Sequence, residues 1–80
     1  MSTAKQYASK AKITGILATN ILKFRDEANL TQKQLALKAG VSQSSIDLIE
    51  KAELLPTLYS VILIGDALRK TLSEMFNENN

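Results

Sequence analysis

The 80-residue chain contains no cysteine and no histidine. Disulfides are therefore absent, and zinc, haem and catalytic-triad chemistries lose their usual ligands. The chain also lacks a Gly-rich phosphate loop, and its Ser and Thr hydroxyls have no histidine base to activate them. We therefore expect no enzyme activity, no catalytic residue, no cofactor and no metal site.

Long apolar runs are missing as well. The longest, residues 61–64, is far too short to cross a bilayer, so we expect a cytoplasmic protein that makes no membrane contact. The chain has one proline and three glycines, and no alternating apolar pattern bounded by turns predicts a hairpin. We expect an all-α protein with one domain.

Acidic residues are scarce in the first half of the chain. Residues 1–38 carry seven Lys or Arg against two acidic residues, a net charge of +5. Residues 39–80 carry three basic residues against six acidic ones, a net charge of −3. The basic half is suited to facing phosphates while the acidic half points away from them.

The basic start of the chain, residues 1–12, allows several interpretations. Lys5, Lys10 and Lys12 predict an arm that follows DNA, an incidental tail, or an extension of the first helix. No acidic residue precedes Asp26, which is also typical of an organelle transit peptide. Cleavage of such a peptide would remove much of the first core helix, so we favour an arm or a helix extension.

Apolar spacing and cap residues predict five helices. Ile13, Leu17 and Ile21 recur every four residues, which is typical of one face of a helix. Ser or Thr stands at the N-cap position of several later segments. The expected helices span residues 13–28, 32–39, 43–51, 58–68 and about 72–76. The polar tail, residues 77–80, is expected to fray.

Residues 32–51 have the spacing of a helix-turn-helix motif. The small Ala36 lets two short helices cross closely, and Gly40 accepts positive φ at the turn between them. The exposed face of the second helix is then available to enter the major groove of DNA. We expect the DNA-binding domain to span residues 13–76.

The motif belongs to a longer pattern that covers residues 17–76. The positions that carry it are Arg25, Leu30, Thr31, Gln32, Leu35, Ala36, Gly40, Val41, Ser42, Ile46, Ile49, Glu50, Pro56, Ala67, Leu68 and residues 72–76. On these positions the chain resembles the lambdoid phage Cro and repressor family, which includes restriction-modification controller proteins and many antitoxins. The resemblance implies a five-helix repressor-like fold with the helix-turn-helix at helices 2 and 3. Ala52 and Arg69 depart from it, because they stand where glycine is usual and a left-handed turn would be strained.

The resemblance also implies which residues contact DNA. In the family, the residue at Gln32 donates to a phosphate and braces the first residue of the recognition helix, here Gln43. Gln43 and Ser44 begin the part of that helix that enters the groove most deeply, where a Gln amide bonds the N6 and N7 edge of adenine and Ser serves several base edges. The same face continues through Asp47 and through Leu48, which offers apolar contact to a thymine methyl. Phosphate contacts are predicted for Lys33, Lys38 and Lys51.

Each of these residues also has a plainer explanation. Gln43 and Ser44 are good helix-start residues that any water-exposed helix carries, and single surface lysines mostly aid solubility. Arg25 and Glu50 each end a helix near the hinge of the motif, so we expect a structural ion pair between them. A lone carboxylate without a second titrating partner makes no acid–base site.

Apolar residues exceed what one small core needs. In the helix expected over residues 58–68, the residues predicted to point inward are Leu58, Val61, Ile62, Gly65 and Leu68, which leaves Tyr59 and Leu63 on a face that should be polar. Such a patch is typical of a partner surface, and a second copy of the chain is the expected partner. Alternatively, Tyr59 or Leu63 folds back against the preceding loop. The predicted interface residues are Leu54, Leu55, Tyr59, Leu63, Met75 and Phe76.

Together these features predict a sequence-specific transcriptional regulator of the repressor or controller type. It would bind an inverted-repeat operator in double-stranded DNA as a homodimer. Two alternatives stay open. An antitoxin would use the motif for autoregulation and its apolar face to bind a toxin. A protein-interaction module such as an antirepressor would bind a protein and show no salt-dependent DNA binding.

Overall fold

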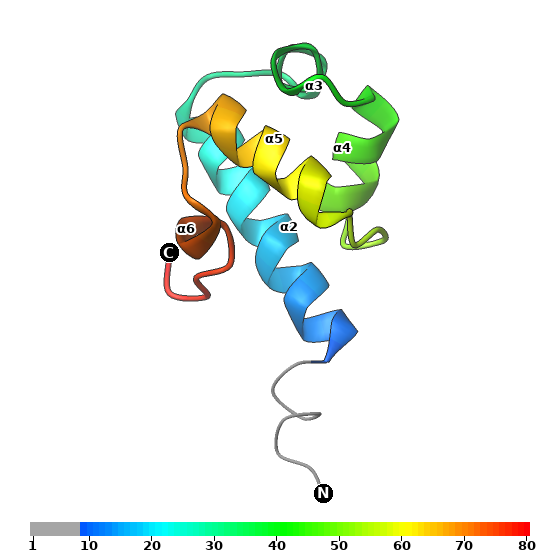
Figure 1. The fold of residues 1–80 in the computed structure, drawn as a ribbon, viewed down its shortest axis with the longest axis vertical. Coiled ribbons are helices and arrows are strands. Elements are labelled where there is room, and N and C mark those ends of the chain that lie inside the picture. Colours follow the sequence, from blue (N-terminus) through cyan, green and yellow to red (C-terminus); the bar gives the residue numbers. More distant parts are fainter. Residues whose placement is uncertain (1–8) are drawn as a thin grey trace, which may run out of the picture.

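The computed structural model describes residues 9–80, and all regular structure in that part of the chain is helical (Figure 1). The five helices are α2 (Lys10–Glu27), α3 (Gln32–Ala39), α4 (Gln43–Glu50), α5 (Leu58–Leu68) and α6 (Leu72–Met75). The expected all-α class is confirmed. Lys5 and most of the predicted arm lie outside the described residues.

Every helix begins after a Ser or Thr whose hydroxyl accepts a hydrogen bond from a backbone N–H of the first turn. These N-caps are Ser9, Thr31, Ser42, Thr57 and Thr71. Such caps satisfy donors that a helix start leaves without an intrahelical partner. Because Ser9 supplies the cap, α2 begins at Lys10, three residues before the predicted start at Ile13. Lys10 and Lys12 are thus exposed on a helix.

Four helices end in the same kind of left-handed turn. The residues with positive φ are Asn29 (57°), Gly40 (76°), Ala52 (60°) and Arg69 (58°). After each of them, the next backbone N–H donates to the carbonyl five residues earlier, as in Lys70 to Gly65 at 2.8 Å and Glu53 to Leu48 at 2.9 Å. This pattern is the Schellman motif. The left-handed turns at the two departures from the family pattern are therefore present, and only one of the four positions is glycine.

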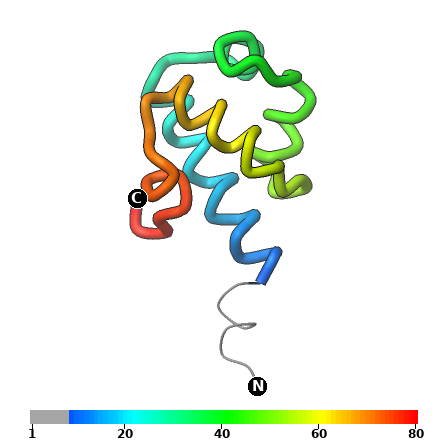
Figure 2. Tube along the Cα trace, in the orientation of Figure 1, coloured from blue at the N-terminus to red at the C-terminus, as the bar shows by residue number. Residues whose placement is uncertain are grey.

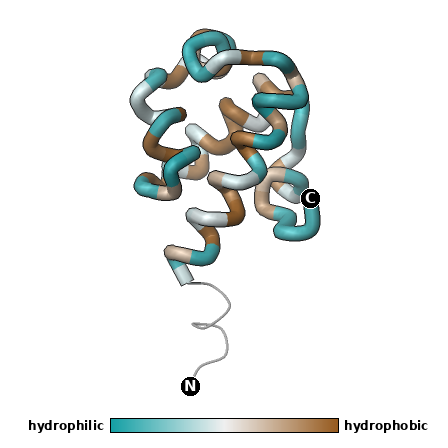
Figure 3. The backbone as a smooth tube through the Cα atoms, turned by 180° about the vertical axis from the view of Figure 1, so that it is seen from behind, coloured by the Kyte–Doolittle hydropathy of each residue, from teal (hydrophilic) through white to brown (hydrophobic). Residues whose placement is uncertain are grey.

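The long α2 runs along the molecule, and α5 crosses it in the view of Figures 1 and 2. The turn-connected helices α3 and α4 lie at one end, while α6 and the C-terminus lie against the side of α2. Seen from behind, the apolar segments cluster inside and the polar ones outside (Figure 3). The side chains that close this core are fully buried: Leu17, Ile21, Leu35, Ile46, Ile49, Val61, Ile64 and Met75.

The buried face of α5 agrees only in part with the predicted one. Val61, Gly65 and Leu68 are buried as predicted, whereas Leu58 and Ile62, also expected to point inward, are 62% and 44% exposed. Ile64 is fully buried, and Leu63, expected outside, is half-buried and packs against the core. The reason is that α5 is apolar on nearly every side, so its periodicity does not select a face. Packing against α3 and α6 selects it: a Cβ on Gly65 would come within 3.0 Å of the Lys70 carbonyl oxygen and 3.5 Å of Met75.

The C-terminal segment is held against α2 by a buried amide. Asn20, only 2% exposed, donates through Nδ2 to the carbonyl oxygens of Met75 at 2.8 Å and Asn77 at 2.9 Å. Asn80 donates in turn to the carbonyl oxygen of Glu74 at 2.6 Å. The predicted interface role of Met75 is therefore wrong, because its side chain is fully buried in its own core. Residues 77–80 are exposed, and their fraying stays a prediction.

Candidate nucleic-acid interface

The helices α3 and α4 form the helix-turn-helix predicted from the sequence. Ala36 is 4% exposed where the two helices cross, and Ile46 and Ile49 fix α4 to the core at 0% and 1% exposure. The left-handed Gly40 ends α3, and the Val41 N–H closes the turn by donating to the Ala36 carbonyl at 3.0 Å. The small residue and the turn glycine thus have the geometric roles that their spacing predicted.

The opposite face of α4 is open to solvent. Its residues recur one and four apart, as one helix face requires, and are Gln43, Ser44, Asp47, Leu48 and Lys51. Gln43, Ser44 and Lys51 are exposed, Leu48 is 38% exposed and Asp47 is half-buried. The Ser42 cap holds the start of the helix through the backbone N–H of Ser45, at 3.1 Å. A rigid helix therefore presents a mixed polar and apolar strip.

The Arg25–Glu50 ion pair expected from the sequence is present. Arg25 donates from Nε to Glu50 Oε2 at 2.6 Å and from Nη2 to Oε1 at 3.0 Å, and from Nη1 to the Leu30 carbonyl at 2.9 Å. The Glu50 side chain is 4% exposed and that of Arg25 is 16% exposed. The hydrogen bond that Arg25 donates to Glu50 raises the pKa of Arg25. This bidentate contact ties the end of α4 to the last turn of α2.

Gln32 braces a different part of α4 from the one expected. Its Nε2 donates to Glu50 Oε1 at 3.0 Å and to Asp47 Oδ1 at 3.3 Å. The brace predicted toward Gln43 is therefore wrong for this arrangement. Two carboxylates lie within reach of the amide, and charged acceptors form stronger hydrogen bonds than a neutral amide oxygen does.

A second ion pair lies on the exposed strip of α4. Lys51 Nζ lies 2.8 Å from Asp47 Oδ2, one helical turn away. Two hydrogen bonds lower the pKa of Asp47, the larger effect coming from Lys51 and the smaller from Gln32. The contact between Lys51 and Asp47 also raises the pKa of Lys51. Arg25, Glu50, Gln32, Asp47 and Lys51 thus form one chain of polar contacts from the edge of the core to the exposed strip.

The residues of α3 that are predicted to contact phosphates are exposed as well. Lys33 and Lys38 both lie on the solvent side of that helix. Leu37, between them in the chain, is 75% exposed, a feature that our sequence reasoning missed. The sequence signal for this exposure was its place in the helix, because it directly follows the buried Ala36 and so points in a different direction.

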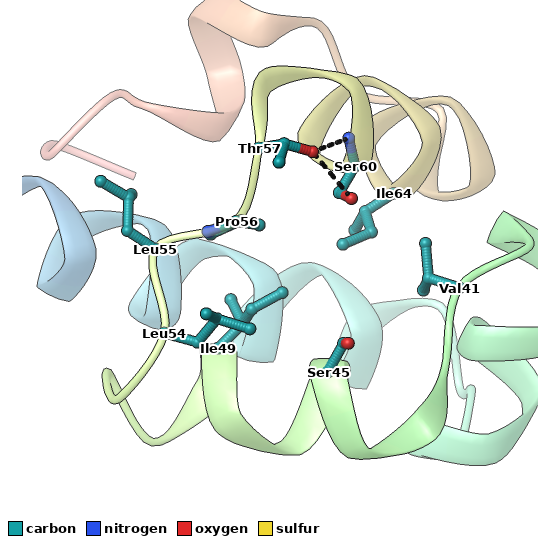
Figure 4. A pocket seen from close by; sticks show the side chains of 9 residues that line it. All are labelled: Val41, Ser45, Ile49, Leu54, Leu55, Pro56, Thr57, Ser60 and Ile64. Carbon is teal, nitrogen blue, oxygen red and sulfur yellow. Dashed lines mark hydrogen bonds between the residues drawn. The ribbon is translucent and has the colours of Figure 1, made fainter.

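Two predicted interface residues line a pocket instead of a flat patch. Leu54 and Leu55 are half-buried and border a pocket of about 190 Å³ between α4 and α5 (Figure 4). Ser45 and Ile64 lie on facing sides of it. Thr57 donates to the Ser60 hydroxyl at 3.1 Å and accepts from its backbone N–H at 3.2 Å. These hydroxyls satisfy one another, which leaves the rest of the lining mostly apolar.

The exposed apolar surface of α5 lies on another face of the helix from Thr57, Ser60 and Ile64, which line the pocket. Leu58, Tyr59 and Ile62 are 62%, 70% and 44% exposed and recur one and four residues apart; we call them the α5 apolar face. Tyr59 is exposed as predicted, whereas the half-buried Leu63 does not belong to the face. Phe76, another predicted interface residue, is 37% exposed after α6.

Other kinds of site find no support in the described part of the chain. Among residues 9–80, no group of three or more Asp and Glu side chains is placed to hold a metal ion. Within the same residues, no helix is both long enough and apolar enough to cross a membrane.

The fold and the open strip of α4 define a helix-turn-helix protein of the DNA-binding class. The model of the HTH_3 helix-turn-helix family matches residues 21–75. The chain belongs to this family of DNA-binding transcription regulators, which confirms the resemblance noted in the sequence.

Two known proteins extend this assignment. The chain is 33% identical over 63 residues to the control protein C.SmaI of Serratia marcescens, covering 79% of this chain and 75% of that protein. It is also similar in fold to the crystal structure of an HTH_3 family transcriptional regulator from Vibrio cholerae, with a TM-score of 0.81 and 24% identity. That match covers 85% of this chain but only 38% of the Vibrio chain.

Proposed function

We propose that this protein is a cytoplasmic, sequence-specific transcriptional regulator of the repressor or controller type, which binds an inverted-repeat operator as a homodimer. The observation that carries the proposal is the open strip of α4, held rigidly on the core by Arg25, Glu50 and the buried isoleucines. A helix fixed in this way pays little ordering entropy when it enters a major groove.

The start of the strip supplies the base contacts. Gln43 bonds adenine through N6 and N7, Ser44 bonds a neighbouring base edge, and Leu48 contacts a thymine methyl. The exposure of all three side chains supports these roles. The absence of Arg and Lys at the start of the strip makes guanine a poor match there.

The lysines hold the DNA backbone. Lys33 and Lys38 on α3 and Lys51 at the end of α4 neutralise phosphates, while Gln32 lies where α3 meets the strip. The Lys51 ammonium has three N–H donors, so it contacts a phosphate while it keeps its solvent-exposed ion pair with Asp47.

The α5 apolar face, with Phe76 beyond it, supplies the dimer interface. An exposed cluster of Leu58, Tyr59 and Ile62 on one helix is suited to packing against its own copy around a two-fold axis. Leu54 and Leu55, half-buried in the loop before α5, are proposed to extend this interface. Two copies then place their α4 helices in half-sites about 34 Å apart.

Selection from a random DNA pool, combined with sedimentation, tests this proposal. We expect a two-fold species in solution and selected sites that are inverted repeats. The affinity should fall steeply with salt, as for about six to ten phosphate contacts. A strict monomer that selects no repeat contradicts the homodimer, and a flat salt response contradicts DNA binding.

The α5 apolar face also supports a second candidate, an antitoxin that binds a toxin through this surface and autoregulates through α4. Its mark would be copurification of the chain with the product of a neighbouring gene. An antirepressor or other protein-interaction module would instead bind a protein partner without salt-dependent DNA binding.

A further inference from the structure

We propose that Asp47 is a base-selecting residue: its carboxylate accepts a hydrogen bond from an exocyclic amino group in the major groove, cytosine N4 or adenine N6, and excludes guanine and thymine at that position of each half-site. This inference rests on the proposed function. It assigns the chemical class of the base that this part of the strip reads.

The position of Asp47 carries the first step. It lies one helical turn after Gln43 on the strip, between the start of α4 and Lys51, and 39% of its side chain is exposed. A side chain at this position of α4 faces the major groove that α4 is proposed to enter. An isolated carboxylate beside phosphates is otherwise unfavourable, because it repels the DNA that the lysines attract.

The orientation of the carboxylate carries the second step. Gln32 Nε2 donates to Oδ1 and Lys51 Nζ contacts Oδ2, so each oxygen is held from a different side. Gln32 is itself fixed, because the same Nε2 donates to Glu50, which Arg25 grips with two hydrogen bonds. A carboxylate has about four acceptor positions, so acceptor capacity remains on both oxygens.

The third step is the chemistry of an ionised carboxylate. The hydrogen bonds from Lys51 and then Gln32 lower the pKa of Asp47, so the group stays an anion at neutral pH. An ionised carboxylate only accepts hydrogen bonds. In the major groove, adenine and cytosine present an amino donor, whereas guanine presents N7 and O6 and thymine presents O4, all acceptors. Asp47 therefore attracts adenine and cytosine and repels guanine and thymine.

Gln32 is then a positioning residue for this contact. Its amide keeps Asp47 Oδ1 directed along the strip and links it to Glu50. Removing that amide should loosen the base preference at the Asp47 position and leave the preference at the Gln43 position in place. A purely structural role for Gln32 would lower affinity without changing any base preference.

Duplexes that lack single amino groups test the contact directly. In the selected operator, each adenine is replaced in turn by purine, which lacks the N6 amino group, and each cytosine by 2-pyrimidinone, which lacks the N4 amino group. Wild-type protein should lose at least about fivefold in affinity at the position that Asp47 reads in each half-site, besides the loss with purine at the adenine that Gln43 contacts. Asp47→Ala should lose less than about twofold at the Asp47 position and keep the wild-type losses elsewhere. A loss that Asp47→Ala abolishes identifies adenine if it occurs with purine and cytosine if it occurs with 2-pyrimidinone.

Asp47→Asn is the second variant, because it keeps the size of the side chain and adds a donor. It should bind unrelated DNA more tightly than wild type, since one negative charge near the phosphates is gone, yet a selected pool should now admit guanine or thymine at that position. Asp26→Asn is the matched control: this exposed carboxylate in the last turn of α2 lies outside the strip, so base preferences should not change.

The outcomes separate the two proposals. If wild-type protein binds no DNA, the proposed function and this inference both fall. If it selects an operator while Asp47→Ala shows the wild-type losses at every modified base, and Asp47→Asn selects the wild-type bases, the role of Asp47 alone is overturned. Circular dichroism and thermal unfolding confirm that both variants are folded.

Discussion

Arg25 and Glu50, separated by 25 positions in the chain, are joined by two hydrogen bonds that fasten the end of α4 to the end of α2. The Glu50 oxygens also accept from Gln32, so a nearly buried carboxylate has donors on two sides. The geometry of α4 therefore depends on a residue of α2 that lies outside the helix-turn-helix itself.

Arg25→Ala should lower the free energy of unfolding by about 3 kcal/mol, because it leaves the Glu50 carboxylate buried with only the Gln32 amide. Urea unfolding followed by circular dichroism measures this loss. Lys23→Ala, an exposed cation on the same helix, is the control and should change stability by no more than about 0.5 kcal/mol. A loss below about 1 kcal/mol in Arg25→Ala would show that the pair does not fasten α4.

Ala52→Gly and Arg69→Gly should each stabilise the fold by about 0.5 to 1 kcal/mol, since both residues have positive φ that glycine adopts without the Cβ clash. In a domain of this size, that gain corresponds to a rise in Tm of about 2 to 8 °C. Ala28→Gly is the control: its φ of −84° gives glycine no advantage, so the Tm should fall or stay unchanged. Equal behaviour of all three variants would count against backbone strain.

Ile62→Glu should convert the dimer to a monomer while leaving the fold intact, because it places a charge in the middle of the α5 apolar face. Operator affinity should fall with it, since two linked half-sites become one. Leu22→Glu is a close control, as Leu22 is 45% exposed on α2 compared with 44% for Ile62. Sedimentation of both variants decides the matter: if only Leu22→Glu dissociates, the interface lies on α2.

Glu74→Gln should reduce the loss of stability in acid. The hydrogen bond from the Thr71 backbone lowers the pKa of Glu74, so this carboxylate stabilises the fold above its unfolded pKa of about 4.3 and loses that contribution as pH falls through its lower folded value. Wild type should exceed Glu74→Gln in urea midpoint near pH 6. The difference should shrink as the pH falls below about 4.3 and vanish once Glu74 is protonated in the folded protein, and a constant difference across this range would rule out the ionised cap.

Local signals predicted much of this structure. The cap residues and turn glycine gave α3 and α5 with the bounds that the structure has, and the positions of Arg25 and Glu50 at helix ends predicted their ion pair. Each of these features depends on residues close in the chain or on one strong charge pair. Such features can therefore be predicted from the sequence itself.

Contacts between distant segments were harder to predict. The buried face of α5 was predicted only in part, because a nearly all-apolar helix carries no periodicity to orient it, and its packing against α3 and α6 decides the orientation. Met75 was assigned to a surface because the hydrogen bond from Asn20, 55 residues earlier, has no signature in the sequence near Met75. The Gln32 contact with Asp47 and Glu50 was missed because three polar side chains had several possible pairings.

Selection from a random DNA pool with wild type, Gln43→Ala and Lys38→Ala tests the reading role of α4 most directly. Gln43→Ala should cost about 1 to 3 kcal/mol on the preferred operator and relax the preference at one base pair in each half-site. Lys38→Ala should weaken binding to all sequences alike and reduce the salt slope by about one unit. If Gln43→Ala stays folded and selects the same bases as wild type, α4 is not the helix that reads the DNA.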